Sequence, residues 1–119
     1  MTDRAELLEI IEKAAREGVT ELDLSGKSIT EIPDCISKIS TLKELNFSNN
    51  EITKIPEFIG GLTNLRGLYI WKNKIEEISP CIGELIYIKK LGLSSNKIEE
   101  IPEFIKKLTS LVRLNLSVN

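Results

Sequence analysis

Side chains that could carry out catalysis are scarce in this sequence of 119 residues. Histidine is absent, which removes the commonest general base and the commonest metal ligand together. No phosphate-binding pattern of the form G-x-x-x-x-G-K-[ST] or G-x-G-x-x-G occurs. We therefore predict that the chain is not an enzyme, with no catalytic residue, no cofactor and no metal site.

The side chains best suited to molecular recognition lie near the middle of the chain. Tyr69 and Trp71 are separated by one residue, and Arg66 and Lys72 flank them. Tryptophan, tyrosine and arginine dominate the binding energy measured in protein interfaces. A strand would place Tyr69 and Trp71 side by side, because alternate side chains of a strand point to the same face.

The elements that would display these residues follow from an internal repeat. Segments of the form L-x-x-L-x-L-x-x-N begin every 23 residues, at Val19, Leu42, Leu65, Ile88 and Leu111. The apolar fourth and sixth positions predict a short strand with both side chains turned into a core. A second aliphatic set follows each strand, and in the fourth repeat it is Ile98, Ile101, Ile105 and Leu108. Because one repeat cannot bury its apolar face alone, we expect the repeats to stack and share a core.

The ninth position of the repeat is asparagine in all segments but the first, which has Lys27. The asparagines are Asn50, Asn73, Asn96 and Asn119. An asparagine side chain offers a donor and an acceptor, so stacked asparagines can satisfy the backbone groups of neighbouring turns. Buried groups left unpaired would cost about 1–3 kcal/mol each. We therefore predict that this column is a structural ladder.

From residue 19 to residue 119 the repeats resemble the leucine-rich-repeat family. The pattern I-P-x-x-I-x-x-L, starting at Ile32, Ile55 and Ile101, is similar to the 23-residue class of intracellular repeats in Ras-group and Roco-type proteins. The opening stretch up to Gly18 looks like bacterial proteins of that sort. The resemblance implies an α/β solenoid with a parallel concave β-sheet of about five short strands, an irregular or 3-10 convex side and an N-terminal capping helix.

Residues 3–17 are predicted to form that capping helix over the first repeat. Asp3 suits the N-cap, with Glu6 as its capping-box partner, and Gly18 suits the position after the last turn.

We expect a single domain over 1–119, with repeats at 19–41, 42–64, 65–87 and 88–110 and a partial fifth repeat at 111–119. The sequence stops in mid-repeat at Asn119, so the last strand is expected to leave an open edge that can pair with another chain. A truncated array and an end covered by self-association both fit this pattern.

The two cysteines, Cys35 and Cys81, hold the same repeat position two repeats apart, with Phe58 between them. Strands roughly 4.8 Å apart would separate them by about 10 Å. A disulfide needs Cα atoms within roughly 7 Å. We therefore predict free thiols and a reducing, cytoplasmic location.

The residues that flank the core positions of each strand would line the concave face. One column of this face changes along the chain from Glu21 and Glu44 to Lys90 and Arg113. Solvation alone accounts for many exposed charges. The alternative is electrostatic steering of a partner with the opposite polarity, of which an antiparallel second copy is one example.

We therefore predict that the concave face binds a protein partner around Tyr69 and Trp71. The candidate partner-binding residues are Glu44, Asn46, Arg66, Tyr69, Trp71, Lys72, Lys89, Lys90 and Arg113. The alternative without a binding role is that Tyr69 and Trp71 are present only because aromatic residues favour strands. The resemblance also implies another role, a regulatory or sensor fragment of a larger GTPase-type signalling protein. The open last edge leaves a self-associating scaffold as a further alternative.

Nucleic acid and membrane partners are not expected. A net charge of −2 at pH 7 does not favour an anionic partner, although Lys89 and Lys90 near Trp71 could mimic a basic aromatic trough for single strands. No apolar run approaches the roughly 20 residues of a membrane span. Self-association through the open C-terminal edge or the concave face stays as an alternative partner prediction.

Overall fold

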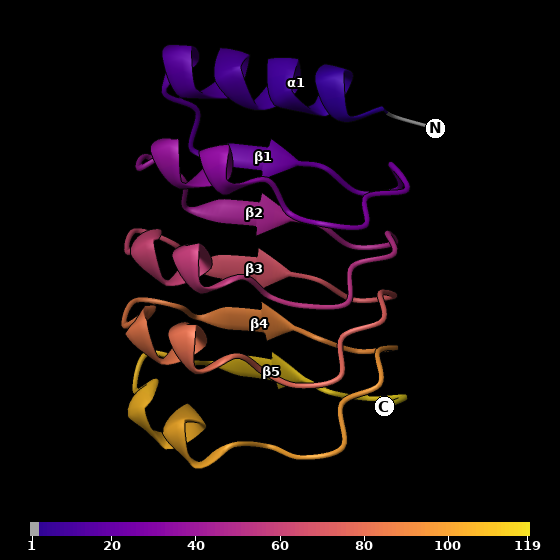
Figure 1. Ribbon diagram of the computed structural model, residues 1–119. Coiled ribbons are helices and arrows are strands. Elements are labelled where there is room, and N and C mark those ends of the chain that lie inside the picture. Colours follow the sequence, from indigo (N-terminus) through magenta and orange to yellow (C-terminus); the bar gives the residue numbers. More distant parts are fainter. Residues whose placement is uncertain (1–2) are drawn as a thin grey trace.

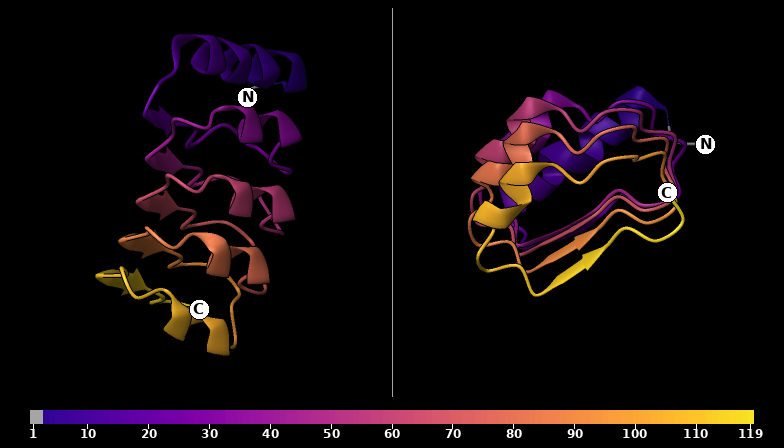
Figure 2. Two further views of the ribbon diagram at one scale, coloured as in Figure 1. Left: turned by 90° about the vertical axis from the view of Figure 1, so that its left-hand side faces the viewer. Right: turned by 90° about the horizontal axis from the view of Figure 1, so that it is seen from below.

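The computed structural model describes residues 3–119, in which one helix covers the end of a stack of similar turns (Figure 1). The helix α1 (Arg4–Glu17) precedes the strands β1 (Glu21–Asp23), β2 (Glu44–Asn46), β3 (Gly67–Tyr69), β4 (Lys90–Gly92) and β5 (Arg113–Asn115). Between successive strands lie the 3-10 helices η1 (Asp34–Lys38), η2 (Glu57–Gly61), η3 (Pro80–Glu84) and η4 (Glu103–Lys107). Figure 2 shows the strands gathered on one side of the stack and the 3-10 helices on the other. The predicted α/β solenoid is confirmed.

The five strands form one parallel sheet in chain order. Equivalent residues of successive repeats lie opposite each other, so that Glu44 pairs with Gly67 and Lys90 with Arg113. The regular 23-residue spacing therefore fixes the register, and residues at one repeat position form straight columns across the sheet.

One core runs through the stack between the sheet and the 3-10 helices. Leu45 and Phe47 enter it from β2 and the residue after it, and both are fully buried. Ile59 enters from η2 and is fully buried too. Because the fourth and sixth repeat positions point inward, the residues between them face the open, concave side of the sheet.

The asparagine column forms the predicted ladder. Asn73 donates from Nδ2 to the carbonyl oxygen of Phe47 in the preceding repeat, at 3.0 Å, and accepts at Oδ1 from the backbone N–H of Ile52, also at 3.0 Å. Asn50 and Asn96 repeat the pattern in their own turns. Each buried asparagine therefore joins two neighbouring repeats through their backbones.

Each ladder turn contains a residue in the left-handed backbone region, which the repeat pattern does not predict. At the eighth repeat position these residues are Gly26, Asn49, Lys72, Ser95 and Val118, with φ between 55° and 65°. Four of them are not glycine, although this region favours glycine. The ladder hydrogen bonds hold the turn closely enough to keep this conformation.

The two ends of the stack differ. At the first end, α1 packs Leu7, Ile11 and Ala14 onto the core, and Asp3 caps it by accepting from the Glu6 N–H at 2.8 Å, as predicted. At the other end Ile101, which the repeat pattern placed in the core, is 62% exposed, whereas the equivalent Ile55 is 5% exposed. That prediction was wrong for Ile101 because no further repeat packs over it in this chain.

Both cysteines are free, as predicted, with Cys81 buried and Cys35 half-buried. No helix within residues 3–119 is long and apolar enough to cross a membrane.

Candidate functional site

Tyr69 and Trp71 form an aromatic pair on the concave face. Tyr69 ends β3, and Trp71 lies two residues further along the chain. Their ring centroids are 5.4 Å apart and their planes meet at 62°, an edge-to-face arrangement. Both side chains are half-buried, so they lie against the sheet instead of standing free of it.

The floor under the aromatic pair is a glycine. Tyr69 pairs in register with Gly92 of β4. A Cβ atom at residue 92 would lie 2.9 Å from Cε3 of Trp71 and 3.3 Å from Cδ1 of Tyr69. The missing side chain at Gly92 therefore makes the room in which both rings pack.

The hydroxyl of Tyr69 meets the Glu44 carboxylate above a second glycine, Gly67. A Cβ atom at residue 67 would overlap the carboxylate and lie 2.6 Å from the hydroxyl. Burial, and then the hydrogen bonding and negative charge of Glu44, raise the pKa of Tyr69 to about 12. The Oε2 atom of Glu44 is buried and lacks a well-aligned hydrogen-bond donor in residues 3–119, although the hydroxyl is adjacent.

A shallow acidic pocket of about 410 Å³ opens between the first two strands and Tyr69. Its lining residues are Glu21, Leu22, Asp23, Glu44, Leu45, Asn46 and Tyr69. Hydrogen bonds from Ser25 hold the pKa of Asp23 below its usual value, so this carboxylate is ionised at neutral pH. The pocket gathers three carboxylates beside one aromatic ring.

Asn46 has a structural task as well as a place in this pocket. Its Oδ1 accepts from the backbone N–H of Ser48 at 2.8 Å. Asp23 and Asn115, at the same repeat position, make the same bond two residues along the chain, to Ser25 and Ser117. One lone pair of this oxygen is therefore used by the turn after the strand, which leaves its second lone pair and the amide nitrogen of Asn46 for a partner.

The basic residues gather at the other end of the concave face. Lys89 and Lys90 are exposed at the start of β4, and Lys90 pairs in register with the exposed Arg113. Arg66 is exposed just before β3, whereas Lys72 lies at the rim, in the left-handed turn after the strand. The structure thus separates the predicted site residues into an acidic group, an aromatic pair and a basic group.

None of these concave charges is neutralised within the described part of the chain. The ion pairs found in residues 3–119 join Lys13 to Glu17, Lys74 to Glu51 and Lys106 to Glu103. All of these lie outside the sheet strands. The opposite charges on the concave face are therefore available to an incoming molecule.

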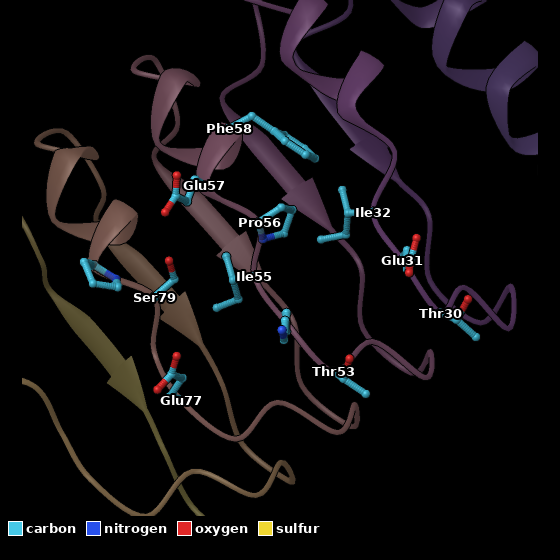
Figure 3. Close-up of a pocket in the computed structure, with 12 residues that line it drawn as sticks. Thr30, Glu31, Ile32, Thr53, Ile55, Pro56, Glu57, Phe58, Glu77 and Ser79 are labelled. Atoms are coloured by element: carbon cyan, nitrogen blue, oxygen red, sulfur yellow. The ribbon is translucent and has the colours of Figure 1, made fainter.

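A second hollow, which was not predicted from the sequence, lies on the flank that connects the strand ends to the 3-10 helices (Figure 3). This flank groove has a volume of about 740 Å³. Ile32, Ile55, Pro56 and Phe58 contribute apolar surface, and Glu31, Glu57 and Glu77 contribute charge. The signal that could have revealed it is the alignment of the Ile-Pro pairs in successive repeats.

Comparison with known proteins identifies the repeats. Family models described as leucine-rich repeats match residues 40–82, as two copies, and residues 87–108, as one. Neither model describes a catalytic family. No curated protein matches the chain.

Solved structures with a similar fold include proteins of Listeria monocytogenes and Arabidopsis thaliana. Internalin C2 of Listeria monocytogenes is 29% identical with a TM-score of 0.76, over 87% of this chain and 44% of that one. The internalin inlF of the same species is 28% identical with a TM-score of 0.79, and the match covers 98% of this chain and 32% of inlF.

A third similar structure is the ectodomain of the Arabidopsis thaliana receptor kinase GASSHO1/SCHENGEN3, solved in complex with CASPARIAN STRIP INTEGRITY FACTOR 2. It is 38% identical with a TM-score of 0.68, and the match covers 76% of this chain and 11% of the ectodomain. The chain thus spans less than half the length of each of these structures. It is a solenoid of leucine-rich repeats, a type of domain that generally mediates protein–protein interaction.

Proposed function

We propose that the chain binds a protein partner on its concave sheet, with Tyr69 and Trp71 at the centre of the contact. The observation that carries the proposal is the packing of both rings against Gly92. A ring already held in place loses little rotamer freedom on binding, so more of its contact energy contributes to affinity. Half-buried aromatic residues among small and charged ones have the composition of an interface centre with a polar rim.

The unpaired charges on either side support the same proposal. The predicted residues Glu44 and Asn46 lie on one side of the aromatic pair, and Lys89, Lys90 and Arg113 lie on the other. Arg66 and Lys72 border it. Charges that remain unpaired within the chain can guide a partner of complementary charge to the surface. The GASSHO1/SCHENGEN3 ectodomain, similar over 76% of this chain, was solved in complex with CASPARIAN STRIP INTEGRITY FACTOR 2, which also favours a partner-binding role here.

We also propose that the repeats belong to the 23-residue intracellular class and act in the cytoplasm. The identical spacing of the 3-10 helices, which begin at residues 34, 57, 80 and 103, supports the class. The two free thiols support a reducing compartment. The single-domain organisation over 1–119 is part of the same proposal.

Affinity capture with matched variants tests the concave site. Bait proteins would be the wild type, Trp71→Ala and Tyr87→Ala, the last removing an aromatic side chain that is 55% exposed in the turn before β4. We expect Trp71→Ala to weaken binding of a captured, purified partner by at least about 2 kcal/mol, and Tyr87→Ala to leave it unchanged. Calorimetric titration measures the affinity, and thermal unfolding checks that each variant stays folded.

A different outcome would place the partner-binding site outside the concave face. If Trp71→Ala binds like the wild type while a charge reversal in the flank groove, Glu57→Lys with Glu77→Lys, abolishes binding, the partner uses the flank. The concave proposal would then be wrong.

A further inference from the structure

We infer that the acidic pocket between β1, β2 and Tyr69 receives an arginine side chain of the protein partner, beside the apolar contact at Trp71. This inference rests on the proposed function and names the chemistry that the concave face recognises. It concerns one end of the face only, the end where the carboxylates are.

The carboxylates in this pocket need a counter-charge that the chain does not supply. Glu21, Asp23 and Glu44 line the pocket, and none of them forms an ion pair within residues 3–119. Oε2 of Glu44 is buried and the adjacent Tyr69 hydroxyl is uncharged, so the negative charge of this carboxylate is costly to bury. A cation brought by a partner would offset that cost, so the charge balance favours a basic group.

The ring of Tyr69 makes arginine a better occupant than lysine. Tyr69 lines the pocket on the side of β3, and its ring packs against Gly92 and Trp71, which hold it in position. A planar guanidinium can stack on an aromatic ring and donate to a carboxylate in the same pose, whereas an ammonium is a strongly hydrated point charge. The volume of about 410 Å³ is within the range of side-chain and small-ligand pockets.

The basic group at the far end adds directionality. Lys90 and Arg113 repel a second cation, so an incoming basic residue is directed toward β1 and β2. The occupant is a different protein and not a second copy of this chain, because two concave surfaces do not fit closely against each other.

A displayed library of random linear peptides, selected on the immobilised wild-type protein, provides the probe. We expect the selected peptides to be enriched in arginine, and to lose affinity at least about tenfold when that arginine is replaced by citrulline, its neutral near-isostere. The same peptides should lose at least about tenfold on Asp23→Asn with Glu44→Gln.

These substitutions keep the size of both side chains, and Asn46 and Asn115 show that asparagine makes the same turn bond as Asp23. The matched control is Asp34→Asn with Glu9→Gln, which removes two exposed carboxylates in η1 and α1, outside the sheet, and should bind the peptides like the wild type. Amide NMR spectra confirm that each variant is folded and locate the shifted residues.

The outcomes separate this inference from the proposed function. Peptides that need Trp71 but bind without arginine, or that ignore the Asp23→Asn and Glu44→Gln changes, overturn the arginine pocket and leave the concave site standing. Peptides insensitive to Trp71→Ala and Tyr69→Ala overturn both. A selection without any arginine-dependent binder overturns the pocket. A dimer in sedimentation that Arg113→Gln dissociates would identify a second copy as the occupant, and would also overturn it.

Discussion

The indole of Trp71 packs across Gly92 of the neighbouring strand, and a Cβ atom at residue 92 would lie 2.9 Å from its Cε3. The two residues are 21 positions apart in the chain but become neighbours because consecutive repeats pair in register. Because Gly92 has no side chain, the indole of Trp71 can lie across the neighbouring strand. The glycine therefore sets the orientation of the indole ring on the concave face.

Gly92→Ala is therefore expected to displace Trp71 without unfolding the protein. The added methyl group collides with a ring that can turn toward solvent, so the cost to stability should stay below about 1 kcal/mol. Tryptophan fluorescence should shift to the red and the near-ultraviolet circular dichroism should change. Gly61→Ala is the control, since nothing lies within 4 Å of its added Cβ. An unchanged emission spectrum in Gly92→Ala would contradict the packing described here.

Asn73→Ala should destabilise the stack by about 2 kcal/mol or more, because it leaves the buried N–H of Ile52 without an acceptor. It also removes one of the two amide donors to the carbonyl of Phe47, the other being Asn50. Asn119→Ala removes equivalent bonds at an exposed end of the ladder and should cost clearly less. Urea unfolding of the two variants measures the difference. Equal losses would mean that burial does not set the strength of the ladder.

Tyr69 should ionise well above an ordinary tyrosine, because its pKa is raised from 10.0 to about 12. Absorbance titration in a Tyr87→Phe background isolates its signal, and Glu44→Gln should lower the value by removing the adjacent negative charge. A Tyr69 that titrates near pH 10 in the folded protein would contradict the burial of the hydroxyl as well as its contact with Glu44.

The same pKa shift makes stability depend on alkaline pH. The folded protein holds the Tyr69 proton more tightly than the unfolded chain does, so this stabilisation is complete below pH 10 and is lost as the pH rises toward 12. The free energy of unfolding of the wild type should therefore fall more steeply over that interval than that of Tyr69→Phe. Parallel curves would refute this linkage.

The two thiols should react at different rates with a thiol reagent. Cys35 is half-buried and Cys81 is buried, and burial raises the pKa of both thiols, which lowers the fraction of reactive thiolate. The faster phase should disappear in Cys35→Ser and the slower one in Cys81→Ser. Equal rates in the folded wild type would show that Cys81 is accessible.

Much of the architecture could be predicted because its determinants are local and repeated. The 23-residue spacing of aliphatic residues fixed the strand positions, the parallel register and the asparagine ladder, and Asp3 and Gly18 marked the helix ends. The same pattern failed at Ile101, because burial there depends on a further repeat and not on the residue itself.

The candidate site was only partly predictable. Sequence columns placed Tyr69, Trp71 and the charges on one face, since register follows from the period. Contacts between repeats decide the details of the site. They determine that Trp71 lies over Gly92, that Asn46 accepts a hydrogen bond in its turn, and that Glu44 helps to enclose a pocket. The 23-residue spacing is enough to predict which residues share a column. How their side chains pack can be seen only in the folded stack, because packing depends on the space that neighbouring strands leave open.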